Sequence, residues 1–217
     1  IAAEIVQKTA RDGYTLMLTS SGMLAIAPAL GQKLTYDIVK DFAPVAAVNN
    51  VPLLMVVHPS SPGTSVREFI ASAKSRPGRI AMATNGAGST PDLAGALFQS
   101  LTGTRLIAVP YKGSGPAQID LAGSQVEVYF DQLSAAMGFV NSGKTRALAV
   151  LAKARVAQLP DVPTIAEAGV PGCEASTFTG LLAPVGTPRE IILRLNAAVN
   201  GALRTAAVKD TFSKLAA

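Results

Sequence analysis

The amino-acid sequence predicts an α/β protein in which mainly parallel sheets are covered by helices. Strand-like and helix-like segments alternate along almost the whole chain, and several strand-like runs are continuously apolar, as in Leu53–Val57. Small polar and glycine-rich turns separate the segments. The length of 217 residues is enough for one large domain or two small lobes.

The first half of the chain opens with the pattern of an amphipathic helix over residues 1–6. A short apolar strand over residues 14–18 ends in the polar cluster Thr19–Gly22, and a helical piece reaches about residue 30. Ser65 and Glu68 form a capping box for a helix over residues 66–75. Thr90 is expected to cap the next helix, over residues 91–101, with Pro91 at its first position. The strands of this half are expected at residues 43–48, 53–57 and 80–83.

The second half continues the alternation, with strands expected at residues 106–110, 126–130, 146–152 and 178–184. Helices are expected at residues 116–121, 133–141 and 165–168, and a last helix runs from residue 188 to the C-terminus. Neither terminal helix has a signal for its outer end. We therefore expect the sequence to be part of a longer mature protein.

The composition excludes several classes of protein. Hydrophobic residues make up 49% of the chain, which is too much for a disordered protein. Cys173 is the single cysteine, so no internal disulfide can form, and no cofactor or metal site is predicted. The net charge of +5 comes from scattered residues, which favours an ordinary solvated surface over a nucleic-acid face. No window approaches the roughly 18 apolar residues of a membrane helix, and no signal peptide is visible.

Residues 138–145 match the phosphate-loop pattern G-x-x-x-x-G-K-[ST]. That site needs a strand before the loop and a helix after it, so that helix N–H groups face the phosphates. Here the predicted order is reversed, because a helix precedes and the strand starting at Arg146 follows. We interpret the motif as a helix end and a turn.

Two polar loops are better candidates for a ligand site. The loop Asn85–Pro91 lies between a strand and a helix, where it forms either an anion site at the helix start or a plain capped turn. The cluster Thr19–Gly22 also follows a strand. Ligands of open α/β sheets gather at the carboxyl ends of strands, so the two loops suggest a cleft that holds a carboxylate at two points. Asp131 follows a third strand and either receives an ammonium or hydroxyl group or caps the helix at Leu133, the second being favoured.

Nucleophilic catalysis has little support in the sequence. The single histidine, His58, follows a strand, and no G-x-S-x-G motif is present. A hydrolase or transferase that uses His58 is nevertheless one hypothesis. A structural histidine is the favoured interpretation.

Several ordered motifs together resemble one family. They are Asp12–Leu16, Tyr36–Asp37, Lys40–Val45, Gly88–Thr90, Leu93–Gly95, Val109–Gly113, Phe130–Asp131, Arg146–Val150, Leu159–Thr164, Leu181–Pro184 and Gly186–Pro188. In these segments the chain is similar to the Bordetella uptake gene (Bug) proteins. They are the solute receptors of tripartite tricarboxylate transporters, also called the TctC family.

This resemblance implies a type II periplasmic binding protein and not an enzyme. Two lobes are expected: residues 1–56 and the return segment 153–217 form the first, and residues 57–152 form the second. They would close by a hinge motion over a small carboxylate held in the cleft between them, which is a di- or tricarboxylate, an amino-acid-like acid or an aromatic acid. The loaded receptor would work in the periplasm and dock with the membrane permease subunits of the transporter, without inserting into the membrane. The positions that match the family's binding residues are Thr19, Ser20, Ser21, Gly86, Ala87, Gly88, Ser89, Thr90 and Asp131.

The resemblance also has departures. The family's first strand and its glycine-rich loop correspond to positions before Ile1, and its last segment to positions after Ala217. Asp92 stands where the family often has histidine, which adds negative charge beside an anion site. The alternative function is the effector-binding domain of a transcription regulator, which shares the two-lobed architecture. A helix-turn-helix before Ile1 would favour it, whereas a signal peptide there would exclude it.

Overall fold

The computed structural model describes residues 2–214, and the chain divides into two compact units. Among the described residues, unit 1 contains residues 2–50 and 178–214, and unit 2 contains residues 51–177. The chain thus passes between the units at residues 50–51 and 177–178. The lobe boundaries expected from the sequence, at residues 56–57 and 152–153, stay a prediction about functional domains.

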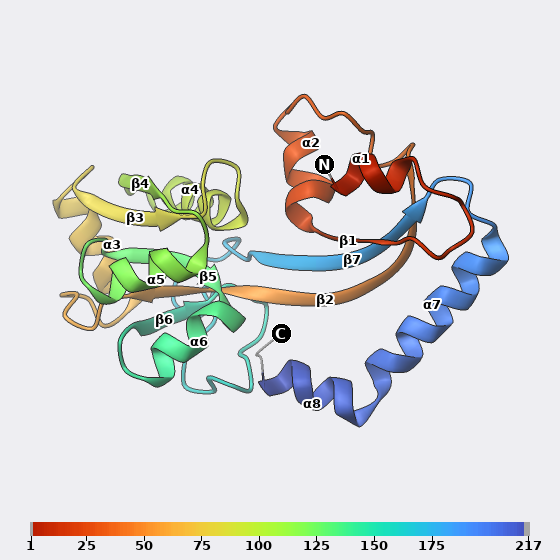
Figure 1. Cartoon of the computed structure of the whole chain (residues 1–217). Coiled ribbons are helices and arrows are strands. Elements are labelled where there is room, and N and C mark those ends of the chain that lie inside the picture. The colour runs from red at the N-terminus through yellow and green to blue at the C-terminus, as the bar shows by residue number, and fades with distance from the viewer. Residues whose placement is uncertain (1, 215–217) are drawn as a thin grey trace. The chain divides into compact units, whose positions relative to one another are not determined.

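Unit 2 is built on a five-stranded sheet in the order β6-β2-β5-β3-β4 (Figure 1). The strands are β2 (Phe42–Val57), β3 (Ile80–Thr84), β4 (Leu106–Pro110), β5 (Val128–Gln132) and β6 (Arg146–Val150). β3 pairs in parallel with β4 and β5, while β2 runs antiparallel to both β5 and β6.

The expectation of a mainly parallel sheet therefore holds only for the strands that helices connect. β3, β4, β5 and β6 share one direction because each is joined to the next by a crossover helix. β2 enters unit 2 from unit 1, so no crossover helix fixes its direction. It lies between β5 and β6 and is antiparallel to both.

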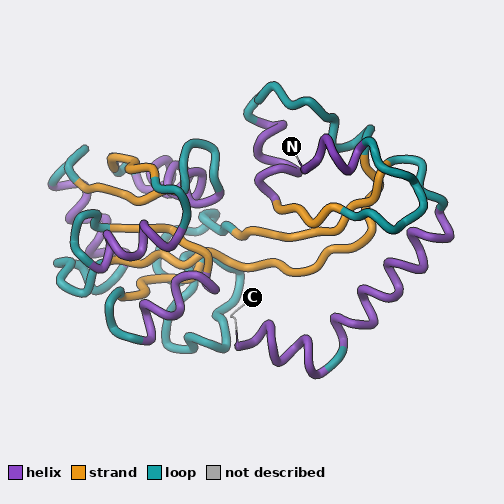
Figure 2. Tube along the Cα trace, in the orientation of Figure 1, coloured by secondary structure: helices purple, strands orange, loops and turns teal. Residues whose placement is uncertain are grey.

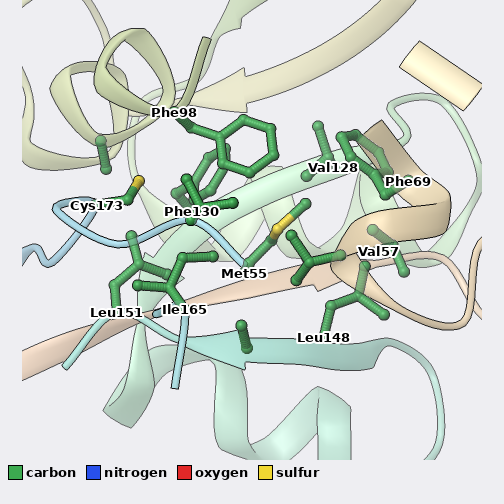
Figure 3. Close-up of a cluster of buried hydrophobic side chains, with 14 of the residues drawn as sticks. Met55, Val57, Phe69, Phe98, Val128, Phe130, Leu148, Leu151, Ile165 and Cys173 are labelled. Carbon is green, nitrogen blue, oxygen red and sulfur yellow. The ribbon is translucent and has the colours of Figure 1, made fainter. Parts of the chain in front are cut away.

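Helices cover both faces of this sheet. α3 (Val66–Ser75) and α4 (Thr90–Thr102) supply side chains to the main apolar core, whereas α5 (Ser114–Ala122) and α6 (Leu133–Asn141) contact each other and β5. In the core, the Phe98 ring lies 5.3 Å from that of Phe130 and 6.2 Å from that of Phe69 (Figure 3). Phe130 faces this core, so the strand alternation turns its neighbours Tyr129 and Asp131 toward α5.

Unit 1 contains three strands in the order β1-β7-β2. They are β1 (Met17–Ser20), the first part of β2, and β7 (Ser176–Pro184), of which the residues from Phe178 onward belong to unit 1. β1 and β7 pair antiparallel, so the mainly parallel sheet expected in this lobe is wrong. β7 enters directly from unit 2 and no helix of unit 1 connects it to β1, which leaves its direction free. Ala3, Val6, Met17, Phe42 and Leu182 form the core of the unit.

The helices of unit 1 are α1 (Ala2–Gln7), a π-helical turn η1 (Gly22–Ile26), α2 (Ala27–Ala29), α7 (Arg189–Arg204) and α8 (Ala206–Lys214). The helix expected from residue 188 onward is therefore divided at Thr205, whose backbone is extended. Residues 215–217 of that expected helix, and residue 1 of the first, lie outside the described residues. No helix among residues 2–214 is long and apolar enough to span a membrane.

Most other elements form where the sequence predicts them. Helices 66–75 and 133–141 and strand 106–110 have the expected bounds. The strands expected at residues 43–48 and 53–57 are one continuous strand, seen unbroken in Figure 2, because β2 passes from β7 in unit 1 to β5 and β6 in unit 2. Residues 165–168 form turns instead of the expected short helix.

Candidate functional site

The polar candidates of unit 2 gather at the carboxyl edge of its crossover-connected strands. There β3 leads through Asn85–Ser89 into α4, β4 leads through Tyr111–Gly113 into α5, and β5 leads directly into α6. Three helix starts therefore meet one edge of the sheet, the usual position of ligands in open α/β sheets.

The loop before α4 forms a tight turn that fixes the helix start. Gly86 and Gly88 have φ angles of 94° and 75°, which favour glycine. Ser89 caps the helix, because its Oγ accepts a hydrogen bond from the Asp92 N–H at 3.4 Å. The prediction that Thr90 is the cap is wrong by one residue: Ser89 is extended, whereas Thr90 is already helical. In return, the Asp92 carboxylate accepts the Gly88 N–H at 2.9 Å.

This loop still keeps donors for a ligand. Within residues 2–214, the backbone N–H groups of Ala87 and Thr90 have no hydrogen-bond partner. A β-carbon built on Gly86 would meet nothing within 4 Å, so the loop also faces open space. The sequence left open whether this loop is an anion site or a plain capped turn. The two interpretations are compatible, because the turn is capped and free N–H donors remain beside the cap.

The start of α5 is a second source of free donors. Gly113, with φ 123°, occupies the cap position and supplies no side chain. In the described part of the chain, the N–H groups of Ser114 and Gly115 have no partner. β-carbons on Gly113 and Gly115 would also meet nothing within 4 Å. An uncapped helix start that faces open space favours an anion.

Asp131 lies within β5 and is fully buried, with 0% of its surface exposed. Its carboxylate accepts hydrogen bonds from the Ser114 hydroxyl at 2.6 Å, the Gln118 amide at 2.8 Å and the Gln132 N–H at 2.8 Å. Burial raises the pKa of Asp131 above its ordinary value, and these hydrogen bonds oppose that rise. The favoured expectation that Asp131 caps α6 is wrong, because Gln132 is the cap residue and no side chain caps this helix.

Tyr129 links Asp131 to the loop before α4. Its hydroxyl donates to the Asn85 side-chain oxygen and lies 3.3 Å from the Ser114 hydroxyl. Burial and the Asp131 charge together raise the pKa of Tyr129, so the phenol stays protonated and remains a donor.

Three members of this network were not among the candidates predicted from the sequence: Ser114, Gln118 and Tyr129. Asn85 was included there only as the first residue of the candidate loop. Two signals could have found them. Residues 113–115 read Gly-Ser-Gly directly after a strand, and the alternation along β5 places Tyr129 on the face of Asp131.

The predicted residues Thr19, Ser20 and Ser21 lie in unit 1, at the end of β1 and the start of η1. Thr19 and Ser21 are each 5% exposed, and neither hydroxyl has a hydrogen-bond partner among the described residues 2–214. Buried hydroxyls are normally paired. These two are therefore candidates for contacts with a ligand. Ser20 is half-buried and ends the strand.

Two other sequence candidates lie away from this edge. His58 lines a small pocket with Ser60, Ile80 and Glu127, at the amino ends of β3 and β5, and its Nδ1 lies 2.7 Å from the Ser60 hydroxyl. The phosphate-loop pattern at residues 138–145 is the end of α6 and a turn that leads into β6, which is the reversed order that the sequence predicted. No group of three His, Cys, Asp or Glu side chains among the described residues could hold a metal ion.

The family of the chain follows from comparison with known proteins. The model of the tripartite tricarboxylate transporter family receptor, TctC, matches residues 1–216. The chain belongs to this family. BugT of Bordetella pertussis is 41% identical over 214 residues, which are 98% of this chain and 66% of BugT. The chain thus spans about two thirds of the length of the curated relatives that it matches.

Solved structures agree with this assignment. Rpa4515 of R. palustris, solved with adipate, superposes with a TM-score of 0.90 at 37% identity, over 99% of this chain and 72% of that one. MatC of Rhodopseudomonas palustris, solved with malate, gives a TM-score of 0.86 at 36% identity, over 99% and 73% of the two chains. The periplasmic binding protein fold predicted from the sequence is confirmed. The family consists of solute-binding receptors and not of enzymes.

Proposed function

We propose that this protein is an extracytoplasmic receptor that binds a small carboxylate and delivers it to the permease of a tripartite tricarboxylate transporter. Family membership supports the receptor role and favours it over an effector-binding domain of a transcription regulator. The proposal also includes the periplasm as the place of action and the closing of two lobes over the ligand.

The observation that carries the carboxylate assignment is the set of free donors at the carboxyl edge of unit 2. The unpaired N–H groups of Ala87, Thr90, Ser114 and Gly115 belong to two helix starts, and glycines leave space in front of them. Backbone N–H groups and the helix dipole stabilise an anion without a charged side chain.

The residues predicted from the sequence take distinct roles in this proposal. Gly86–Thr90 supply backbone donors and the shape of the loop. Asp131 organises the network behind α5. Thr19 and Ser21 offer hydroxyls whose hydrogen-bonding capacity is unused in unit 1, and Ser20 is a further contact there.

The test is the thermal unfolding midpoint of the intact protein in a panel of mono-, di- and tricarboxylates. A ligand that binds only the folded state raises the midpoint, and the added stability grows with the logarithm of the ligand concentration above Kd, reaching about 2.7 kcal/mol at a concentration 100-fold above Kd. We expect a concentration-dependent rise with at least one carboxylate. No rise with any member of the panel would refute the proposal.

A matched pair of variants localises the binding. Gly115→Leu fills the open space before α5 without a clash, and Gly138→Leu does the same on the exposed side of α6. Both proteins should fold. Only the Gly115→Leu variant should lose the ligand-induced rise, and an equal response from the two variants would place the ligand elsewhere.

A further inference from the structure

The pocket of His58 lies at the amino ends of β3 and β5, the edge of the sheet opposite to the proposed carboxylate site. It has a volume of about 130 Å³ and is lined by the turn after β2, by α3 and by the turn after α5. The buried side chains of Phe69, Ile80 and Val126 make up its apolar side. Since one water molecule takes about 30 Å³ of the liquid, the pocket has room for about four waters, which suits one small oxyanion.

The polar side of the pocket contains protons that no acceptor has taken. Ser72 Oγ accepts a hydrogen bond from the Arg76 guanidinium at 2.9 Å, so the serine proton is free for another partner. His58 Nδ1 accepts the Ser60 N–H at 3.1 Å, which places the proton of the neutral ring on Nε2. Within residues 2–214 neither proton has an acceptor. Both side chains line the pocket, so a ligand with acceptor oxygens fits them.

Ser124 lines the same pocket in a backbone conformation that suits glycine. Its φ of 58° is the one positive value for a residue other than glycine in the described chain. Ser124 follows the end of α5, where a left-handed residue is usually glycine. A side chain at such a position costs stability. The Ser124 hydroxyl has no partner among residues 2–214, so the fold gains nothing from it, whereas a ligand in the pocket would.

The charge around the pocket is positive. Arg76 Nη1 lies 3.8 Å from the Glu127 carboxylate, and both side chains line the pocket. Two further arginines are held close by, because the Arg79 N–H donates to the Arg76 carbonyl and the Gly78 N–H donates to the Arg105 carbonyl. Neither Arg79 nor Arg105 forms an ion pair in the described chain. One carboxylate among three guanidinium groups leaves a field that attracts an anion.

Glu127 decides which oxyanion fits. One of its oxygens accepts the Ala81 N–H at 2.6 Å, and the other still has lone pairs free beside Arg76. A carboxylate repels an oxyanion without protons, such as sulfate at neutral pH. Inorganic phosphate at the same pH always carries at least one P–OH group. That group can donate to Glu127 while the other oxygens accept from Arg76 and the serine hydroxyls.

We propose that this pocket binds inorganic phosphate, with Arg76, His58, Ser72 and Ser124 as donors to its oxygens and with Glu127 as the acceptor that selects a protonated oxyanion. The site is separate from the carboxylate site, and the inference does not rest on the proposed function. Bound phosphate would connect the turn after β2, α3 and the turn after α5, and would therefore stabilise the folded state.

Calorimetric titration of the intact protein with inorganic phosphate and with sulfate tests this inference, at pH 7, fixed ionic strength and in a buffer free of other oxyanions. We expect phosphate to bind with a Kd roughly tenfold lower than sulfate, the effect of one charge-assisted hydrogen bond. Glycerol 3-phosphate, which is mostly a dianion without a P–OH group at this pH, should bind as weakly as sulfate. No binding of phosphate, or equal affinities for phosphate and sulfate, would overturn the inference.

Two ion pairs of unit 2 provide matched variants. Arg76→Gln should weaken phosphate binding about tenfold, and Glu127→Gln should bring the two affinities together by strengthening sulfate. The Arg155–Glu167 pair, 3.0 Å apart and similarly exposed, lies outside the pocket. Arg155→Gln and Glu167→Gln should leave both affinities unchanged. An unchanged preference for phosphate in Glu127→Gln, or an equal loss in Arg76→Gln and Arg155→Gln, would contradict the inference.

Ser124→Gly separates binding from folding. Its φ suits glycine, so the variant should unfold at a higher temperature than the wild type while it binds phosphate several-fold more weakly. Phosphate affinity equal to that of the wild type would contradict the donor set. The carboxylate-induced rise in the unfolding midpoint should be the same in all these variants, so failure of the carboxylate test and failure of the phosphate test are distinguishable.

Discussion

The polar residues at strand ends are bonded in opposite ways in the two units. In unit 2, Asn85, Ser114, Gln118 and Tyr129 are joined to one another or to Asp131 by side-chain hydrogen bonds. In unit 1, the buried hydroxyls of Thr19 and Ser21 have no hydrogen-bond partner among residues 2–214. Unit 2 thus holds these polar groups in a network within the fold, whereas the two hydroxyls of unit 1 remain available to another molecule. Removal of a hydroxyl should therefore have opposite effects on stability in the two units.

The largest expected effect is at the centre of the bonded network. Asp131→Ala removes the acceptor of three donors, of which the Gln118 amide is buried and the Ser114 hydroxyl and Gln132 N–H are half-buried. It should lower the free energy of unfolding by about 3 kcal/mol, since an unpaired buried donor costs about 1–3 kcal/mol. Denaturant unfolding measures this loss. A loss below 1 kcal/mol would mean that the network contributes little to the fold of unit 2.

A smaller effect is expected at the helix starts of unit 2. Ser89→Ala and Ser65→Ala each remove a side-chain cap, from α4 and α3 respectively, and should each cost about 1 kcal/mol. The same unfolding experiment applies to both. If Ser89 were a ligand contact without a capping role, Ser89→Ala would leave stability unchanged while Ser65→Ala lowered it.

Removing a buried hydroxyl of unit 1 should change the free energy of unfolding in the opposite direction. Thr19→Val replaces an unpaired buried hydroxyl with a methyl group of similar size and should raise the free energy of unfolding by up to about 1 kcal/mol. The matched substitution in unit 2, Ser114→Ala, should lower it. The Thr19→Val protein should also respond less to carboxylates. Destabilisation by Thr19→Val would show that the hydroxyl is paired inside the folded protein.

The smallest expected effect is the pH dependence of the free energy of unfolding that Asp131 causes. Its folded-state pKa is raised above the ordinary value of 3.8, mainly by burial, so the native state holds the proton more tightly than the unfolded state. Stability therefore falls as pH rises from 3.8 to the folded-state value and is constant above it. The difference in unfolding free energy between wild type and Asp131→Asn, measured across this range, should show that slope. A difference that does not change with pH would contradict the assignment.

The sequence predicted the elements whose local signals agree with their tertiary environment. The Ser65 cap, the apolar spacing of α3 and the reversed phosphate-loop pattern are of this kind, because each depends on neighbouring residues only. The direction of β2 and β7 is different. Those strands pass between the units without a crossover helix, and no pattern within a strand records its partner's direction.

Only part of the candidate site could be predicted from the sequence, because only part of it depends on neighbouring residues. Glycines and small polar residues after a strand identify the loop of Gly86–Thr90 and the cluster at Thr19 from the chain alone. The roles of Ser114 and Gln118 depend on hydrogen bonds to Asp131, 17 and 13 residues away along the chain. Only the pairing of β5 with β3 and the packing of α5 on β5 bring them together.

The most direct test of the account is a crystal structure of the intact protein with the carboxylate that gives the largest thermal shift. We predict a ligand carboxylate oxygen within hydrogen-bonding distance of the N–H groups of Ala87 and Thr90, or of those of Ser114 and Gly115. A ligand bound in the pocket of His58, with none of its atoms near these N–H groups, would contradict the account.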